Sequence, residues 1–391
     1  MHNEKFDFIP KSNNDKIMDA EYVKVTELDR EYIVSDHGNT VIVKYQAPQF
    51  EIGGIPNPKD NCGKFYRMDF SLATTEGGNY YRFNMNNNIQ NGNWYVTGGT
   101  IRFCTNAEYF NLIAATPKYT DASKRSNGRG VAGFDVYVGS GTDRVYCGKR
   151  KQVMCNPPST VDTVNLPAGY KEVLINMPLA SGIANLTFAF PKDAEIAPPT
   201  ARSLDKPIVF YGSSITQGLC ASRPGTAYAN MVCRMLDADC RNLGYSEGAR
   251  AEDATIEYIA GQDMCAFVME YDNEAPLAQL EKTHYKLYEA VRAKNPDIPI
   301  VMLSKPMFTT EFDNEPLYED EKRLALIKDS YNKAVESGDK KVYFINGYED
   351  LLPIRDMADV YTGDFSRPND TGMYFIGLAV YKKLTEAFGT N

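Results

Sequence analysis

Residues 208–218 read IVFYGSSITQG. The apolar start of this stretch, with Pro207 before it, predicts a buried strand over 207–211, and the Gly-Ser-Ser that follows predicts a turn at its end. Such a turn puts one hydroxyl at the mouth of a sheet, near a helix N-terminus whose dipole favours developing negative charge. Ser214 is therefore a candidate nucleophile, although a turn that only caps the next helix would have the same sequence.

The chain after this stretch alternates apolar segments with helical ones. Further strands are predicted over 264–269, 298–303 and 341–345, and helices over 227–235, 277–294 and 322–337. Alternation of this kind builds a parallel sheet with helices on both faces. Ligands of such sheets bind beyond the C-terminal ends of the strands, which is where Ser214 is expected to lie.

The sequence before a Pro-marked linker at 197–199 has a different character. Short β-branched or aromatic runs occur at 41–45, 80–85, 100–104, 134–138 and 185–190, and glycine-containing turns are predicted at 77–78, 91–92 and 98–99. Many short strands at regular spacing are typical of a sandwich or jelly roll. The 391 residues fit two domains, and we predict an all-β sandwich over 1–200 and an α/β domain over 201–391.

Charge and composition narrow the range of partners. The net charge is -9 and no run of five Lys or Arg occurs, which argues against nucleic acid. No apolar stretch of membrane-spanning length is present, and the polar N-terminus has no apolar signal segment, so we predict a cytoplasmic protein without a membrane partner. Eight cysteines without a CxxC pair and three histidines predict reduced thiols and no metal site, and a disulfide or two in an exported protein is the alternative interpretation. We expect no cofactor. A homo-oligomer is compatible with these features.

Two motifs resemble one branch of a known family. Residues 208–218, with ASRPG at 221–225 after them, resemble block I of the SGNH/GDSL hydrolases, in which Gly-Asp-Ser ends in the nucleophile. Residues 133–137, GFDVY, are similar to the Gly-x-Asp-Leu-Tyr mark of a branch that carries an N-terminal sandwich. The resemblance covers about residues 64–381. It implies a three-layer, flavodoxin-like hydrolase domain, Ser214 as nucleophile, and hydrolysis of acyl esters of carbohydrates or other small molecules.

Blocks II and III of the family depart from its pattern. Block II resembles Asn-x-Gly-x-Ser-Gly, and its last Gly gives a backbone N–H to the oxyanion hole. Residues 242–247, NLGYSE, keep Gly244 but have Glu247 in the last place, where a conformation suited to Gly would be costly. Block III supplies an Asn side-chain donor. Residues 271–276, YDNEAP, put Glu274 there, and a shift of one residue would put Asn273 there instead.

Block V departs at the base itself. The family has an Asp, two residues and then the general-base His, whereas residues 364–370, DFSRPND, keep Asp364 and have Arg367 in place of the His. Arginine cannot be deprotonated in a protein, so Arg367 cannot activate a serine. Loss of the base from a serine triad costs on the order of a million-fold in rate. His284 falls within a predicted helix, where we expect it to pack rather than to replace the base.

Three functions follow from these substitutions. The first is a family acyl esterase with weak or altered activity, and the second is a pseudoenzyme that binds a small-molecule or carbohydrate ligand, or a partner, without turnover. The third is different chemistry, built on Ser214 with Glu247 or Glu274. Because an unpaired buried charge is costly, we also expect Arg367 to pair with one of these glutamates or with Asp364.

Overall fold

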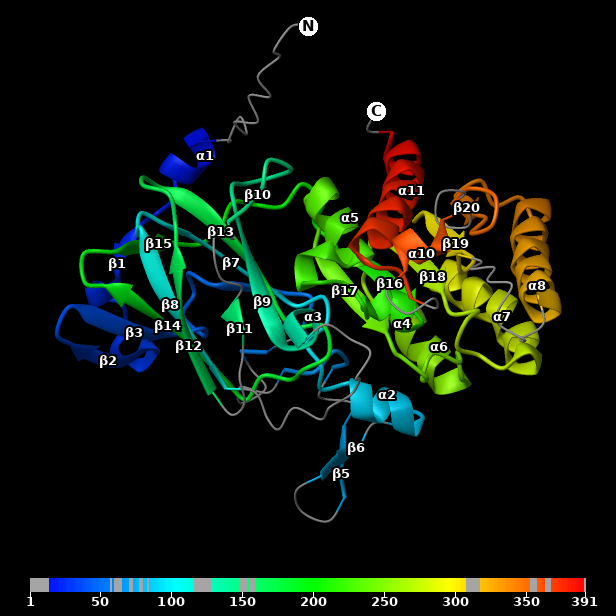
Figure 1. The fold of residues 1–391 in the computed structure, drawn as a ribbon, viewed down its shortest axis with the longest axis horizontal. Coiled ribbons are helices and arrows are strands. Elements are labelled where there is room, and N and C mark those ends of the chain that lie inside the picture. The colour runs from blue at the N-terminus through cyan, green and yellow to red at the C-terminus, as the bar shows by residue number, and fades with distance from the viewer. Residues whose placement is uncertain are drawn as a thin grey trace, which may run out of the picture.

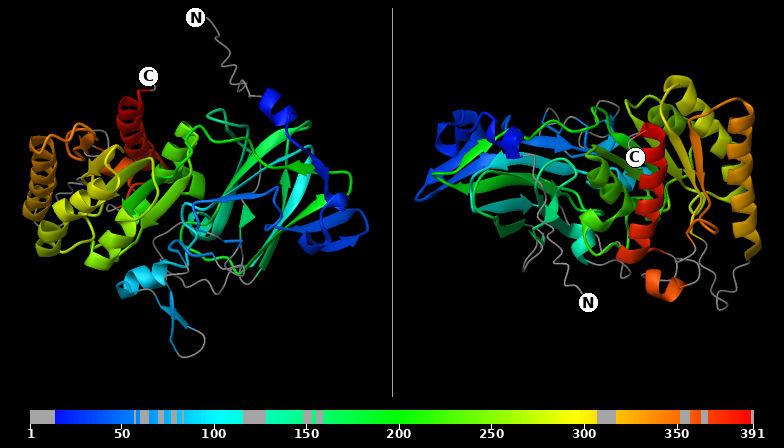
Figure 2. Two further views of the ribbon diagram at one scale, coloured as in Figure 1. Left: turned by 180° about the vertical axis from the view of Figure 1, so that it is seen from behind. Right: turned by 90° about the horizontal axis from the view of Figure 1, so that it is seen from above.

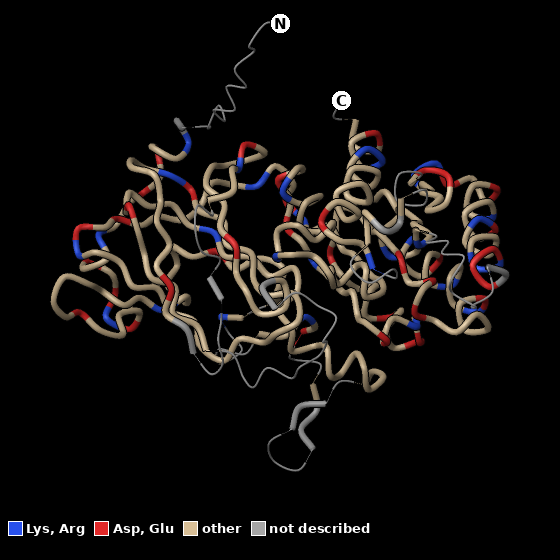
Figure 3. The backbone as a smooth tube through the Cα atoms, in the orientation of Figure 1, with Lys and Arg blue, Asp and Glu red and all other residues tan. Residues whose placement is uncertain are grey.

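The computed structural model describes residues 14–56, 58–59, 65–69, 73–76, 80–82, 84–115, 128–147, 153–154, 159–306, 317–351, 357–362 and 367–389. Figure 1 shows an N-terminal β domain beside a C-terminal α/β domain, as the sequence predicted, and the two views of Figure 2 show the domains side by side. Positively and negatively charged residues are intermixed along the backbone of both domains (Figure 3). None of the helices in the described ranges is long and apolar enough to cross a membrane.

The N-terminal domain is a sandwich of two antiparallel sheets. One sheet has the strand order β1 (Val23–Lys24), β15 (Glu195–Ala197), β7 (Thr100–Thr105), β13 (Lys171–Asn176), β9 (Gly133–Val138) and β10 (Val145–Tyr146), with β4 (Glu51–Gly53) beside β7 and β11 (Val153–Met154) beside β9. The other has the order β12 (Ser159–Asn165), β8 (Tyr109–Ala115), β14 (Asn185–Pro191), β3 (Thr40–Lys44) and β2 (Ile33–His37).

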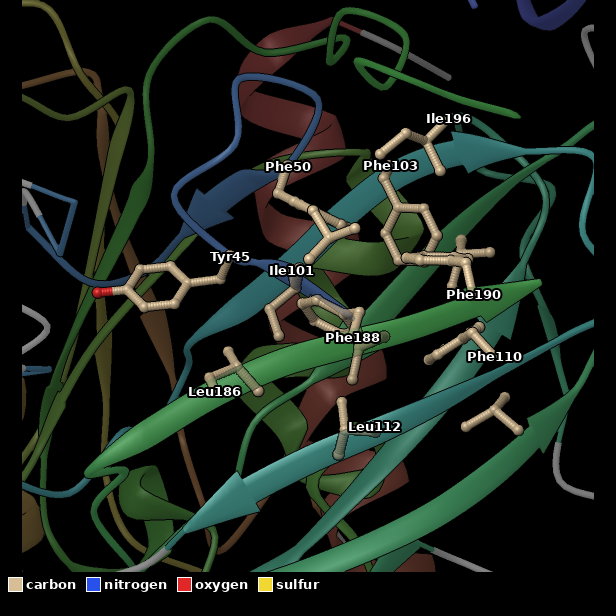
Figure 4. Packing of buried hydrophobic residues seen from close by; sticks show 14 of the residues in the cluster. Tyr45, Phe50, Ile101, Phe103, Phe110, Leu112, Leu186, Phe188, Phe190 and Ile196 are labelled. Carbon is tan, nitrogen blue, oxygen red and sulfur yellow. The ribbon is translucent and has the colours of Figure 1, made fainter. Parts of the chain in front are cut away.

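Aromatic side chains fill the space between the two sheets (Figure 4). Phe103 from β7 and Phe188 from β14 are fully buried, and Phe50 stacks on Phe188 with their ring centroids 4.8 Å apart. β8 alternates buried and more exposed residues along its length, as a strand with one face on the core does. Burial of such aromatic rings supplies much of the stabilisation of a sandwich core.

Shorter elements decorate the sandwich: α1 (Asn14–Met18), η1 (Val25–Glu27), η2 (Arg30–Tyr32), the hairpin β5 (Thr74–Glu76) and β6 (Tyr80–Arg82), α2 (Asn87–Gly92) and α3 (Gly128–Ala132). The turn predicted at 91–92 is wrong, because both residues belong to α2. The Asn86 side chain caps this helix by accepting the N–H groups of Asn88 and Ile89 at 3.1 and 3.0 Å. A cap of this kind outweighs the turn preference of Asn-Gly.

The C-terminal domain is built on a parallel sheet with the order β17 (Cys240–Gly244), β16 (Ile208–Gly212), β18 (Ala266–Glu270), β19 (Ile300–Leu303) and β20 (Val342–Ile345). Its helices are α4 (Ser214–Gln217), η4 (Pro224–Thr226), α5 (Tyr228–Leu236), α6 (Asp253–Ala260), α7 (Leu277–Lys294), α8 (Leu317–Glu336), α10 (Ala358–Tyr361) and α11 (Asp370–Phe388). β17 was not predicted, because its Arg241 and Asn242 interrupt the apolar pattern. α8 begins five residues before the predicted start at 322.

The helices cover both faces of this sheet. Val209 and Tyr211 of β16 pack into a core with residues of α6, α7 and α8, whereas Ile208 and Phe210 pack on the opposite face with residues of α5 and α11. This three-layer arrangement is the predicted SGNH-type fold. It brings the C-terminal ends of β16, β17 and β18 together at one edge.

Candidate functional site

Ser214 lies where the sequence predicted, at the C-terminal end of the first strand of the parallel sheet. β16 ends at Gly212, and Ser213 caps α4 by accepting the N–H of Ile215 at 3.0 Å, which makes Ser214 the first helical residue. A Cβ at Gly212 would lie 2.1 Å from the Glu270 carbonyl oxygen, so only glycine fits this turn. Ser214 is 2% exposed.

Glu274 bridges two backbone donors beside Ser214. Its Oε1 accepts the N–H of Ser214 at 2.9 Å, and its Oε2 accepts the N–H of Glu247 at 2.8 Å. Hydrogen bonds of N–H groups to a carboxylate are charge-assisted and stronger than those between neutral groups. Two N–H groups that converge on one anionic group form the kind of arrangement that stabilises an oxyanion, and here the chain's own carboxylate fills it.

Glu247 adopts the glycine-like backbone conformation that we expected to be costly at this place in block II. Its φ is +60°, in the left-handed region, where a side chain with a Cβ is disfavoured by about 1–2 kcal/mol. The residue is exposed, whereas Gly244 at the start of the same turn is buried. A Cβ at Gly244 would lie 2.3 Å from the backbone nitrogen of Gln217, so glycine lets this turn approach α4.

The alternative between Glu274 and Asn273 is decided by where their side chains bind. Asn273 is exposed, and its Oδ1 accepts a hydrogen bond from Lys305 Nζ at 3.4 Å. Glu274 is half-buried and lies against the backbone of Ser214. The carboxylate, rather than the amide, therefore occupies the place beside Ser214.

Arg367 is the residue of block V that the structure brings to Ser214. Its Nε donates to Ser214 Oγ at 3.3 Å. Arg367 lies just before α11, whose N-cap residue Asn369 accepts the N–H of Thr371 at 3.0 Å. Asp364 lies outside the described residues, so its expected pairing with Arg367 stays a prediction. Within the described part of the chain, Arg367 donates to Ser214, and the oxygens of Glu274 accept backbone N–H groups.

His284 packs in the core, as predicted for a residue on this helix. It is 1% exposed, its ring stacks on Tyr271 with centroids 5.7 Å apart, and burial lowers the pKa of its imidazole to about 3. It is therefore a neutral packing residue.

Glu270 is a part of the site that the sequence analysis missed. It ends β18, and its carboxylate accepts the hydroxyl groups of Ser213 and Thr216, both at 2.8 Å. Burial, with the neighbouring Asp272 carboxylate as a second cause, raises the pKa of Glu270 to about 8. The available sequence signal was a glutamate directly after the predicted apolar strand 264–269, and only the structure places it beside the Gly-Ser-Ser turn.

The sandwich domain holds the turn of residues 244–248. Arg67 is fully buried, donates to the carbonyl oxygens of Gly244 and, at 2.7 Å, Gly92, and lies over the Tyr245 ring at 4.0 Å. The Asn88 side chain donates to the carbonyl oxygen of Glu247 at 2.8 Å. The conformation of this turn therefore depends on the other domain, which no local sequence pattern could reveal.

Gln217 connects the same turn to the sandwich by a second route. Its Oε1 accepts the N–H of Ser246 at 3.0 Å, and its Nε2 donates to the Leu179 carbonyl oxygen at 3.3 Å. Gln217 lies in the stretch that first pointed to Ser214, yet only its two partners reveal this linking position.

The GFDVY motif joins the two domains. Asp135, which is 1% exposed, accepts hydrogen bonds from Arg223 Nη1 at 2.7 Å and from the Gly225 N–H at 2.8 Å. The Tyr137 hydroxyl accepts a second hydrogen bond from Arg223 at 2.6 Å, and the guanidinium of Arg234 lies 4.2 Å from the Tyr137 ring centroid. The motif therefore binds the loop that follows α4.

A pocket of about 190 Å³ lies between the domains next to this site. The sandwich contributes residues of α2 and Tyr95 to its walls, and the α/β domain contributes Gln217, Ser246 and Glu247. Most of the polar groups in these walls are uncharged amides and hydroxyls. Glu247 belongs both to the pocket wall and to the pair of N–H groups that Glu274 bridges, so the pocket reaches the residue that is linked to Ser214 through Glu274.

Comparisons with known proteins agree with this geometry. Residues 205–385 match the family described as GDSL-like Lipase/Acylhydrolase. A search of curated proteins gave no significant match. Among solved structures, a Bacteroides ovatus protein described as a GDSL-like lipase has 21% identity and a TM-score of 0.73, with 90% of this chain and 98% of that chain covered.

Two further structures share the architecture. The salicylyl-acyltransferase of a tetracycline biosynthetic pathway has 16% identity and a TM-score of 0.69, over 91% of this chain and 99% of its own. A mutant family two carbohydrate esterase from Clostridium thermocellum has 14% identity and a TM-score of 0.53, over 75% and 93%. At these identities the likeness establishes the fold, and function has to be argued from the site.

Proposed function

We propose that this protein, whose residues 205–385 match the GDSL-like lipase/acylhydrolase family, is an SGNH hydrolase relative that binds a carbohydrate ligand and hydrolyses esters weakly or not at all. The proposal rests on the state of the site beside Ser214. The fold and the nucleophile position are those of an acyl hydrolase, whereas the groups around the hydroxyl are changed.

The Glu274 carboxylate is the observation that carries this proposal. An ester carbonyl in reaction at Ser214 needs N–H donors for its developing negative charge, and the donors of Ser214 and Glu247 are already bound to Glu274 at 2.9 and 2.8 Å. An ionised carboxylate accepts hydrogen bonds but cannot donate one, and it repels a second anion. A substrate would therefore have to displace Glu274 before the reaction could be stabilised.

The hydroxyl of Ser214 also lacks a suitable base among the described residues. Arg367 donates to Ser214 Oγ instead of accepting its proton, and the neutral His284 is stacked in the core on Tyr271. A serine hydroxyl is a weak nucleophile until a neighbouring group removes its proton. Both requirements of acyl transfer, the activated nucleophile and the free oxyanion donors, are impaired together.

The ligand class is proposed from the pocket and from one relative. The pocket combines amides, hydroxyls and the aromatic ring of Tyr95, which are the groups that hydrogen-bond sugar hydroxyls and pack on sugar rings. The structure from Clostridium thermocellum is named as a carbohydrate esterase. We infer that a carbohydrate binds between α2 and the turn of residues 244–248.

The proposal is tested by ester hydrolysis. We expect 4-nitrophenyl acetate turnover by the natural chain to lie far below the roughly 10 per second of a typical enzyme. The double variant E274N/R367H, which restores a neutral donor and a base, should turn the ester over faster, and adding Ser214→Ala should remove that gain. Robust turnover by the natural chain that Ser214→Ala abolishes would contradict the proposal.

A second candidate function is supported by the closeness of Glu274 to Ser214. A carboxylate 2.9 Å from the backbone nitrogen of a serine is near enough to serve as its base after a side-chain rotation. In that case Glu274→Gln would abolish any residual turnover that depends on Ser214. Under the first proposal the same change should leave turnover unchanged or raise it, so this variant separates the two.

A further inference from the structure

Glu247 combines a strained backbone with a side chain for which the described residues provide no hydrogen bond or ion pair. Its φ of +60° is left-handed, its N–H is bound by Glu274, and its carbonyl oxygen is bound by Asn88. Glycine would make both backbone hydrogen bonds in the same conformation without strain. Within the described ranges the Glu247 carboxylate has no hydrogen-bond or ion-pair partner, and the residue is exposed.

Strain that the fold does not need indicates a function for the side chain. Residues in sparsely populated backbone regions persist where the surroundings hold them, and they concentrate at binding and catalytic sites. Here the holding groups are in place, since Asn88 and Glu274 fix the peptide units on either side of the Glu247 Cα. The carboxylate is therefore carried on a rigid turn at the wall of the interdomain pocket.

We propose that Glu247 is a ligand-contact residue whose carboxylate accepts hydroxyl groups of a neutral polyhydroxyl ligand in this pocket. The inference rests on the proposed ligand-binding function and names the group that recognises the ligand. A carboxylate offers two oxygens with about four acceptor sites, which suits two neighbouring hydroxyls of one sugar ring. Hydrogen bonds of this kind are charge-assisted.

The uncharged polar groups of the pocket suit a neutral polyhydroxyl ligand. Arg67 is fully buried, and its guanidinium binds carbonyl oxygens and the ring of Tyr245. Tyr245 and Gly92, both contacts of Arg67, line the pocket. Arg67 thus puts a positive charge behind this wall, while Glu247 carries a negative charge at its rim and the Glu274 carboxylate accepts the Glu247 N–H at 2.8 Å. The remaining polar side chains there, such as Asn91 and Tyr95, are uncharged and can donate hydrogen bonds.

The test measures binding and stability on the same variants. Cellohexaose, xylohexaose and mannohexaose are titrated into the full chain by calorimetry, with Glu247→Gln and Glu247→Gly as variants. We expect at least one oligosaccharide to bind and both variants to weaken its affinity by about tenfold or more, as for loss of a charge-assisted hydrogen bond. Glu247→Gly should at the same time raise Tm, because the strain is removed. Glu257→Gln, an exposed glutamate on α6, is the matched control.

Three results would overturn this inference. The first is equal affinity of Glu247→Gln and the natural chain for the bound oligosaccharide, and the second is the absence of binding for all three oligosaccharides. The third is a Tm of Glu247→Gly below that of the natural chain, because the side chain would then serve the fold. Ester turnover is measured separately, so high turnover would refute the proposed weak hydrolysis without touching the affinity comparison.

Discussion

Arg367 Nε donates a hydrogen bond to Ser214 Oγ over 3.3 Å. The hydroxyl that a hydrolase would deprotonate thus faces a group that can only donate protons to a hydrogen bond. A positive neighbour lowers the energy of an alkoxide, but it provides no acceptor for the proton that must leave.

Ser214 of the natural chain should resist a fluorophosphonate probe. Replacement of Arg367 by His supplies a base, and general-base assistance raises rates by about a hundredfold or more. We therefore expect Arg367→His to be labelled faster, as followed by intact-protein mass, but not to regain full esterase activity, because Glu274 would still bind both backbone donors. Ser214→Ala in the same background is the control. Fast labelling of the natural chain would show that another base is at work.

Removal of the Glu274 carboxylate should leave a vacant anion site. Glu274→Ala frees the N–H groups of Ser214 and Glu247, and the loss of hydrogen bonds to a charged group should lower the free energy of unfolding by about 1–3 kcal/mol. Sodium acetate at about 0.1 M should then raise the Tm of this variant by mass action, because acetate binds the folded state. The natural chain in acetate, and the variant in sodium chloride, should show no such rise. An equal effect of acetate on the Tm of both proteins would contradict the conclusion that Glu274 occupies the anion site formed by these two N–H groups.

The buried Glu270 predicts a pH dependence of stability. Its pKa is raised from 4.5 to about 8, mainly by burial. In the unfolded chain the group loses its proton above about pH 4.5, whereas the folded protein keeps it to about pH 8, so unfolding releases a proton in this window. Stability should therefore fall as pH rises from about 4.5 to 8, by up to about 1.4 kcal/mol per pH unit, and level off above it.

Glu270→Gln should flatten that profile. The free energy of urea unfolding, measured from pH 5 to pH 9 for both proteins, gives the comparison, and the exposed Glu257→Gln should keep the natural slope. Asp272, whose pKa burial raises to about 6, contributes in the same direction below that pH, so some slope should remain in Glu270→Gln. Parallel profiles for Glu270→Gln and the natural chain would rule Glu270 out as the cause.

The Asp135 carboxylate should contribute far more to the free energy of unfolding than an exposed acidic residue does. Its carboxylate is buried and holds Arg223 at 2.7 Å and the Gly225 N–H at 2.8 Å across the domain boundary. Removing one partner of a buried ion pair typically costs about 3–5 kcal/mol, and we expect Asp135→Ala to fall in that range in urea unfolding. Asp253→Ala, which breaks the exposed pair with Lys286, should leave the midpoint nearly unchanged. Equal losses of stability in the two variants would show that the GFDVY motif does not hold the two domains together.

The sequence alone determined the fold and the position of Ser214 at the end of the first parallel strand, since both depend on local patterns. An apolar run followed by a turn predicted the strand that ends just before Ser214, and the helix expected at about 277–294 is α7. The same local reading identified Arg367 as unable to act as a base, because that property belongs to the guanidinium itself.

Only the tertiary structure decided what surrounds that hydroxyl. Glu274 and Ser214 are 60 positions apart, and the contact between them arises because β16 and β18 are neighbours in the sheet. The choice between Glu274 and Asn273 depended on a one-residue register that sequence could not fix. Arg67, Asn88 and Glu270 were missed for the same reason: each acts through a backbone group or side chain far away in the chain. Hydrogen bonds are short-ranged and directional, so they are set by the packing of whole elements rather than by residue type.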